Sequence, residues 1–302
     1  MGALKIIFIC VLWLSAQEAR SGLFGHSLRN KADFPSDRSF SWSDEVQGIT
    51  HDEQNWFISQ INGLWRIPAD LNLNTSFSGR EKSLGVARVE IPADLRAQGY
   101  YHMGDIDYYQ GHIYVPVEGR HRPFKLLKID AATMELKGVA NFWQQQKHAP
   151  YVAINPTTGI LYTSEFTPNK KVGLYGYKMI DDEKGFRLEH APRLVLKNAK
   201  GDRPVKVHRI QGGEFDLETR TLFLVSDRVD GGILAFDMDT GNFKYAHYVD
   251  YRPGFPNYEE LEGITIWRKA EHKTAGVEGA IHVLMLDNDL NGDDVYLKHY
   301  DF

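Results

Sequence analysis

The sequence has almost no cysteine: Cys10 is the only one among 302 residues. It lies in an apolar run near the N-terminus, so a chain that has lost this run has no thiol. Disulfides, thiolate metal sites and cysteine nucleophiles are then excluded. A protein of this size without disulfides is held together by its hydrophobic core, which favours one large closed architecture over a small cross-linked one.

Long apolar runs are also scarce. The run from Ile6 to Leu14 follows a lysine, precedes small residues and is too short to cross a bilayer. This pattern is typical of a secretory signal, so we expect residues 1–19 to be removed and residues 20–302 to form a secreted domain, periplasmic in a bacterium. In a eukaryotic host, the sequon NTS makes Asn74 an expected glycosylation site.

An excess of basic residues is missing too. The formal net charge is -5 and charges of both signs are interspersed along the chain. Such a sequence offers no basic patch for nucleic acid and no polybasic surface for a membrane. We therefore expect no nucleic-acid partner and no membrane span, while the oligomeric state is left open.

Helical periodicity is confined to one short stretch, residues 92–99, and the rest of the chain repeats a β-rich pattern. Each copy has a polar approach, a strand, a turn and a second strand that ends in Ser, Asp or Glu. The five copies begin near Val46, Tyr101, Lys147, His208 and Asn257. Their spacing of roughly 45 to 60 residues is typical of propeller blades. We predict an all-β fold, a single five-bladed β-propeller, with six blades as the alternative.

The last copy stops at Phe302 before an outer strand is complete. The segment around residues 23–40 is predicted to supply that strand and so close the ring, because closure removes the edges that pair with other chains.

In a propeller the first strand of every blade surrounds the axis, so the residues before it converge on one mouth. Alignment of the copies places one residue of each at a common level, with Tyr151 or Val152 from the third; the others are Gly48, Asp105, Glu214 and Gly263. Polar residues precede this level, and these are Glu45, Gln47, His102, His148, Gln211, Glu260 and Glu262. Acidic residues end the second strands, and these are Glu118, Glu165, Asp227 and Asp287.

Carboxylates crowded around one axis repel unless protons, cations or hydrogen bonds compensate. Oxygen ligands from several segments are what Ca2+ prefers. The predicted metal ligands are Asp105, Glu214, Glu262 and Gln47. His102 and His148 are then the predicted catalytic residues, free for general acid or base work on a substrate held by the metal. The alternative is structural: such side chains can bind the backbone of the next blade or stay solvated.

Other motifs are weaker. Asp287, Asp289, Asn291 and Asp293 alternate as in an EF-hand loop, but Lys298 occupies the twelfth position and a strand follows, so a hairpin turn is favoured. No G-x-S-x-G elbow presents a nucleophilic serine, which disfavours a serine hydrolase.

ELEGITIW and TLFLVSD resemble motifs of secreted or periplasmic propellers of the esterase-like phytase, gluconolactonase and strictosidine-synthase type. The resemblance implies that Glu262 matches an ion-binding glutamate at the mouth, and that Asp227 matches the acidic end of a second strand. Gln47 in QGI and the stretch HMGDID depart from the pattern. Five blades are instead similar to calcium-activated nucleotidases and to some lectins and glycosidases.

The function that we expect is calcium-dependent hydrolysis of phosphoesters or of esters and lactones. The alternatives are a non-catalytic lectin-like or protein-binding propeller, with a small molecule or glycan at the mouth, and a glycosidase with two carboxylates.

Overall fold

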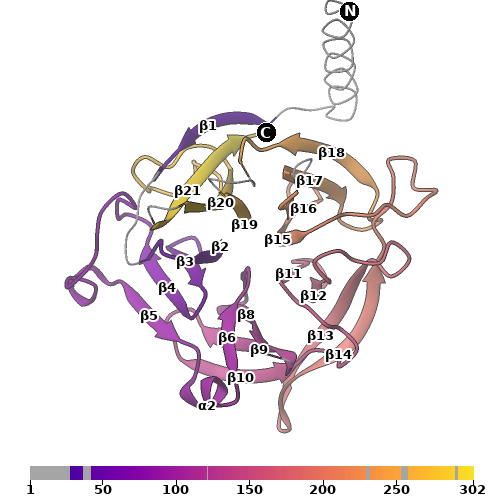
Figure 1. Ribbon diagram of the computed structural model, residues 1–302, viewed down its shortest axis with the longest axis horizontal. Coiled ribbons are helices and arrows are strands. Elements are labelled where there is room, and N and C mark those ends of the chain that lie inside the picture. Colours follow the sequence, from indigo (N-terminus) through magenta and orange to yellow (C-terminus); the bar gives the residue numbers. More distant parts are fainter. Residues whose placement is uncertain (1–27, 37–41, 121, 229–231, 253–257, 290–291) are drawn as a thin grey trace, which may run out of the picture.

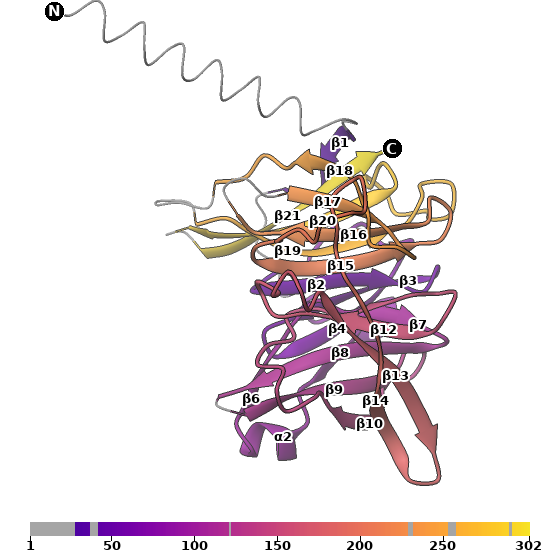
Figure 2. The ribbon, with the colours of Figure 1, turned by 90° about the vertical axis from the view of Figure 1, so that its right-hand side faces the viewer.

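Five antiparallel β-sheets surround one axis in this computed structural model, and the predicted five-bladed propeller is confirmed (Figure 1). The structure describes residues 28–36, 42–120, 122–228, 232–252, 258–289 and 292–302. The predicted signal segment, residues 1–19, lies outside the described residues. Seen from the side, the ring is a thick disc from which the β13–β14 hairpin projects (Figure 2).

Each predicted copy supplies the two inner strands of one blade, and the sequence that follows it supplies the outer ones. Blade 1 is β2 (Val46–His51), β3 (Asn55–Gln60), β4 (Gly63–Pro68) and β5 (Ala87–Glu90). Blade 2 is β6 (Tyr100–Met103), β7 (Asp107–Tyr109), β8 (His112–Gly119), β9 (Arg122–Asp130) and β10 (Leu136–Asn141). Blade 3 is β11 (Ala153–Ile154), β12 (Ile160–Thr163), β13 (Leu174–Asp182) and β14 (Gly185–Leu194). Blade 4 is β15 (Ile210–Asp216), β16 (Thr221–Ser226), β17 (Gly232–Asp237) and β18 (Phe243–Tyr248).

Blade 5 joins the two ends of the described chain. It contains β19 (Glu260–Ile266), β20 (Ile281–Asp289) and β21 (Gly292–Asp301), and β1 (Arg29–Asp33) is its outer strand. β1 pairs antiparallel with β21, with Arg29 opposite Asp301 and Asp33 opposite Lys298. The predicted closing strand is therefore confirmed. The stretch that resembled a calcium loop forms the β20–β21 hairpin, in which Asp289 pairs with Gly292.

The hydrophobic core lies between the blades. Both faces of an inner strand are covered by neighbouring sheets, so strands such as β16, TLFLVS, are buried at every position. Trp56 and Ile58 of blade 1 pack with Leu284 and Val295 of blade 5 in one cluster. Blades 4 and 5 share a similar cluster. Contact between flat faces of this kind favours the β-branched and aromatic residues that produced the strand pattern.

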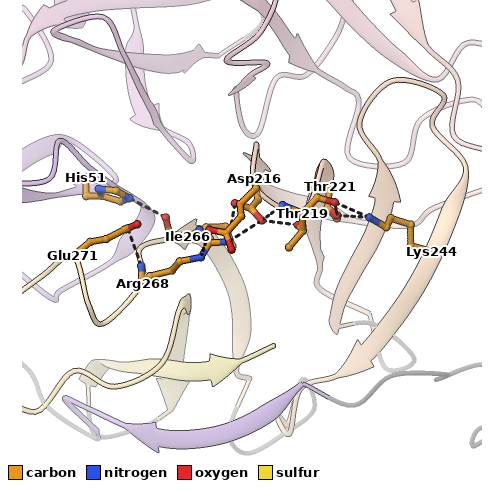
Figure 3. Close-up of polar contacts among 9 residues, drawn as sticks. His51, Asp216, Thr219, Thr221, Lys244, Ile266, Arg268 and Glu271 are labelled. Atoms are coloured by element: carbon orange, nitrogen blue, oxygen red, sulfur yellow. Dashed lines mark hydrogen bonds and ion pairs between the residues drawn. The ribbon is translucent and has the colours of Figure 1, made fainter.

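On the face opposite the mouth, where β15 and β19 end, polar contacts tie blade 4 to blade 5 (Figure 3). Arg268 Nη2 donates to both carboxylate oxygens of Asp216, at 3.1 Å each. The amide and hydroxyl of Thr219 also donate to Asp216. Lys244 of β18 donates to the carbonyl oxygen of Thr219 and to the hydroxyl of Thr221, both in the β15–β16 hairpin. These contacts fix the ends of two strands whose other ends reach the mouth.

Helical structure is slight. The predicted stretch 92–99 contains α2 (Ala93–Ala97), and a 3-10 turn, η1, spans Lys82–Leu84. Within the described residues, no helix is long and apolar enough to cross a membrane.

Candidate functional site

The axis of the propeller is closed by Asp105, which lies between β6 and β7 of blade 2. Its Oδ1 accepts the N–H of Ile49 in blade 1, and its Oδ2 accepts the N–H of Gly213 in blade 4, both at 3.0 Å. Its backbone N–H donates to the carbonyl of Pro150, and its carbonyl accepts the N–H of Val152, both beside blade 3. One buried residue thus binds the backbone of three other blades.

Glycines allow this close approach. A Cβ built on Gly48 would lie 2.4 Å from the Cα of Asp105, and one built on Gly263 would lie 2.7 Å from the Cα of Gly48. Real Cβ atoms do not approach so closely, so only glycine lets the innermost strands meet. The backbones of blades 1, 2 and 5 are therefore in contact at the axis, and they leave no open passage at this level.

The predicted common level is confirmed for Gly48, Asp105 and Gly263, and Tyr151 bridges Asp105 from blade 3. Blade 4 differs. Gly212 and Gly213 meet Asp105 there, and Glu214 does not: a Cβ built on Gly212 would lie 2.7 Å from Asp105 Oδ2, and the Gly213 N–H donates to the same oxygen. The register shifts in the same way in blade 1, between Val46 and Gly48, and in blade 4, between Ile210 and Gly212. Gly212 in QGG is therefore the equivalent of Gly48 in QGI, and Glu214 lies two residues beyond the common level.

We call the contact of Asp105 with Gly48, Gly213 and Gly263 at the axis the plug. Glu214 lies past the plug along β15, near Asp107 of β7. Burial raises the pKa of Glu214 well above its ordinary value, and the charges of Asp107 and Asp105 raise it further. Burial raises the pKa of Asp107 to about 8, although the N–H of Ile154 donates to its Oδ2. The Oε2 atom of Glu214 is buried without a hydrogen-bond partner in the part of the chain that the structure describes. Two buried carboxyl groups that repel each other in this way resist ionising together.

A cavity of about 290 Å³ opens on the other side of the plug. Apolar side chains such as Phe124 and Phe166 form part of its wall. Its polar lining is Glu45, Gln47, His102, Glu118, Gln211, Glu260, Glu262 and Asn288. We call this space the mouth cavity. The sequence correctly predicted a polar mouth rich in carboxylates.

His102 has both ring nitrogens occupied. Its Nε2 lies 2.8 Å from the side-chain oxygen of Gln47, whose own amide N–H₂ donates to the carbonyl of Val46. Its Nδ1 lies 3.2 Å from Glu118 Oε1. An amide oxygen and a carboxylate both accept hydrogen bonds, so each ring nitrogen of His102 faces an acceptor. In this geometry Gln47 and Glu118 engage both nitrogens, which disfavours the predicted role of His102 as the base that activates water.

Glu118 is the ionised carboxylate of the mouth cavity. Burial acts to raise its pKa, but the hydrogen bond and charge of His102, with a hydrogen bond from Tyr101, bring the pKa below its ordinary value. Glu118 is only half-buried, so water screens part of this attraction.

Glu262 behaves in the opposite way. It is only 5% exposed, lines the mouth cavity and has no hydrogen bond to its carboxyl group among the described residues. Burial raises its pKa well above the ordinary value, and the charges of Glu260, Asp227 and Asp105 raise it further, against the opposing charge of Arg209. Burial thus favours the neutral acid form of Glu262, which can donate one hydrogen bond into the cavity and accept others.

Arg209 is a cation beside the mouth that the sequence analysis missed. Its Nη2 lies 2.6 Å from Asp227 Oδ2 and 3.4 Å from Glu260 Oε1. Asn288 Nδ2 donates to the other oxygen of Glu260 at 3.1 Å. Burial raises the pKa of Asp227 to about 6, although Arg209 lowers it. Arg209 directly precedes β15 as Glu45 directly precedes β2, so the signal that identified Glu45 could have found it.

The remaining predicted residues lie elsewhere. His148 does not line the mouth cavity, and its exposed ring packs between Phe124 and Phe166. Asn74 is exposed in the loop between β4 and β5, where a glycan has access. Its glycosylation stays a prediction.

The predicted calcium ligands are only partly brought together. Gln47 and Glu262 line the mouth cavity, whereas Asp105 is buried in the plug and Glu214 lies beyond it. Both carboxylate oxygens of Asp105 already accept backbone N–H groups. No three His, Cys, Asp or Glu side chains of the described ranges are grouped so that they could hold a metal ion. The structural alternative for Asp105, binding the backbone of neighbouring blades, is what its geometry shows.

Comparisons with known proteins indicate no more than the fold. No protein-family model and no curated protein matches the sequence. Quinohemoprotein alcohol dehydrogenase from Comamonas testosteroni is a similar solved structure, with 14% identity, a TM-score of 0.35, and coverage of 89% of this chain and 43% of that chain. A structural genomics protein of unknown function from Bacteroides thetaiotaomicron VPI-5482 has 9% identity, a TM-score of 0.45, and coverage of 89% and 61%. The chain spans less than two thirds of either protein, so the match carries no statement about activity. The resemblance to phytase-like and lactonase-like propellers stays a prediction.

Proposed function

We propose that this protein is a secreted propeller that binds a small, uncharged, hydroxyl-rich ligand, such as a short glycan, in the mouth cavity. The observation that carries the proposal is the neutral, unpartnered carboxyl group of Glu262 on the cavity wall. A hydroxyl group both donates and accepts, and it matches a carboxylic acid and the amides of Gln211 and Asn288 in the same way.

The wall supports a sugar ring as well. Phe124 and Phe166 offer apolar surface on the cavity wall, and two of its carboxylates already have partners. Glu118 is paired with His102, and Glu260 with Arg209 and Asn288. An uncharged ligand can therefore enter without breaking an ion pair. An anion would bring a negative charge close to Glu45, Glu118 and Glu260, without a free cation among the described residues of the wall to pair with it.

The test begins with a glycan array on the mature protein, followed by calorimetry with the best ligand. Glu262→Gln keeps a neutral hydrogen-bonding group and is expected to retain affinity within about threefold, whereas Glu262→Ala is expected to lose about ten- to a hundredfold, equivalent to 1.4 to 2.8 kcal/mol. Because Glu262 donates only while protonated, wild-type affinity should fall as pH rises through its raised pKa, and the Gln variant should not follow.

Glu183→Gln, in the exposed β13–β14 turn, is the matched control and should bind as the wild type does. An array without binders, or equal affinities for the wild type and Glu262→Ala, would refute the proposal.

Hydrolysis is the second candidate, because one cavity holds two carboxyl groups whose pKa values are displaced in opposite directions. Glu262, whose pKa is raised, is placed to act as general acid, and Glu118, whose pKa is lowered, as general base or nucleophile. Phosphoesters and esters or lactones remain the proposed substrates. Glu262→Gln separates the two candidates, since it should abolish turnover of chromogenic phosphate or acyl esters while retaining binding.

The calcium-dependent form of this hydrolase predicts a stabilising ion. Gln47 and Glu262 are the two proposed ligands that reach the mouth cavity, and Ca2+ would hold and polarise a substrate oxygen there. Thermal unfolding in EGTA and across a Ca2+ titration should then show a saturable rise in midpoint, equivalent to about 2.7 kcal/mol at a hundredfold excess over Kd. Mg2+ is the control. An unchanged midpoint in metal-free protein would remove calcium and leave the binding function.

A further inference from the structure

Four buried or half-buried histidines meet where blade 5 packs on blade 1, on the face opposite the mouth cavity. His51 stacks on Trp267 with ring centroids 4.3 Å apart. His272 and His282 approach the same pair of tryptophans, Trp56 and Trp267. His299 on β21 is the direct cross-strand partner of His282 on β20. Neither proposed function uses any of these rings.

His282 and His299 make three contacts through their ring nitrogens. The two Nδ1 atoms lie 2.7 Å apart. His282 Nε2 lies 2.7 Å from the carbonyl oxygen of Trp267, and His299 Nε2 lies 2.9 Å from that of Phe34. All three distances are within the range of hydrogen bonds.

The protons of this pair can be counted. A carbonyl oxygen only accepts, so each Nε2 must carry a proton. The short contact between the two Nδ1 atoms requires another proton between them, because two lone pairs at 2.7 Å repel. Three hydrogen bonds therefore need three protons. Two neutral imidazoles have only two, so a neutral pair leaves one contact without its proton.

We propose that His282 and His299 jointly bind one additional proton, as a hydrogen-bonded imidazole–imidazolium pair that joins β20 and β21 to the ring-closing segment at Phe34. The segment is also held by backbone bonds, from Phe34 N–H to the Leu297 carbonyl and from Leu297 N–H to the Pro35 carbonyl. Loss of the proton leaves a buried Nε2 lone pair against a carbonyl oxygen, a buried polar group without a partner.

The charges around the pair act in both directions. Asp33 and Glu278 favour a positive charge on His299, while His272 disfavours it. His272 and His51 disfavour one on His282. Asp33 is itself bound by Lys298 at 3.0 Å. Burial disfavours a charge on either ring, lowering the pKa of His282 well below its ordinary value and that of His299 to about 4, while the hydrogen bonds to the Trp267 and Phe34 carbonyls act to raise both pKa values. One proton shared by two rings satisfies every contact with a single charge.

His51 provides an internal comparison within the same cluster. Its Nε2 lies 2.9 Å from the carbonyl oxygen of Ile266, and its Nδ1 accepts the N–H of Glu53 at 3.3 Å. One contact needs a proton and the other needs a lone pair, so a neutral ring satisfies both. Burial accordingly lowers the pKa of His51 to about 4.

The test is nitrogen NMR of the ring nitrogens in the full chain labelled with ¹⁵N-histidine, at pH 7. His102→Gln is used as the background, since it removes another histidine whose two ring nitrogens both have partners. We expect one coupled pair in which both Nε2 atoms are protonated and one strongly deshielded proton lies between the Nδ1 atoms, while His51 shows one N–H. His282→Gln should remove the coupled signals and leave those of His51.

A spectrum in which every buried ring carries a single N–H at pH 7 would overturn the proposal. This outcome does not depend on whether a variant in the core folds. As pH is raised, the bridging proton should disappear while amide exchange at Leu297 increases beyond its intrinsic rise with pH. Loss of the bridging proton without faster exchange at Leu297 would contradict the link to ring closure.

Discussion

Asp105→Ala is expected to lower the free energy of unfolding by about 3 to 5 kcal/mol, enough to unfold much of the protein at 37 °C. The substitution leaves the N–H groups of Ile49 and Gly213 buried without an acceptor, at about 1 to 3 kcal/mol each, and it opens a void where three blades meet. Urea denaturation, followed by tryptophan fluorescence, measures the loss.

Two variants test whether the hydrogen bonds of Asp105 explain the loss of stability. Asp105→Asn keeps the volume and one acceptor oxygen, so it should lose roughly half as much. Asp70→Ala, in an exposed turn, should change stability by less than about 0.5 kcal/mol. A loss below about 1 kcal/mol for Asp105→Ala would show that the blades hold together without this carboxylate.

Alkaline pH is expected to destabilise the protein through the buried carboxyl pair of Asp107 and Glu214. The folded state raises the pKa of Asp107 to about 8 and that of Glu214 well above its ordinary value. A raised pKa means that the folded state binds the proton more tightly than the unfolded state. This stability is fully present below pH 4 and is lost as pH rises toward 8, by up to about 1.4 kcal/mol per pH unit for each proton.

Asp107→Asn should flatten this alkaline slope, because an amide keeps the acceptor for Ile154 N–H and cannot ionise beside Glu214. Unfolding free energies of the two proteins between pH 5 and 9.5, at constant ionic strength, give the comparison, with Asp70→Asn as control. Parallel curves between pH 5 and 8 would contradict a contribution of Asp107 to this pH dependence.

The loss of stability at acid pH has a different cause. The pKa of His51 is lowered to about 4 by burial, so its stabilising neutral form is complete above its ordinary value of 6.5 and is lost as pH falls through 4.

The sequence was most informative where the signal is local. Each hairpin has its own turn and its own alternation, so the five copies, the closing strand and the helix near residue 95 could be predicted. Gln47, His102 and Glu262 were found because residues before a first strand converge on one mouth. These features depend on neighbours in the chain.

Other features depend on distances that no short stretch encodes. The pairing of His102 with Glu118 joins residues from two strands, so no short stretch indicates that the ring nitrogens of the expected base already have partners. The closure of the axis follows from contacts among glycines of different blades, which only coordinates reveal.

The pairing of β1 with β21 also sets an order of events during synthesis. Among the described strands, β1 is made first and its partner β21 last, so the outer edge of blade 5 is completed only after the strands of the other four blades have been made. Four blades can assemble while this strand stays unpaired. Among the pairings of the described strands, closing this ring joins the residues farthest apart in sequence and carries the largest entropic cost of bringing chain segments together. A nascent chain is therefore exposed to pairing with other chains at β1 until β21 has been made.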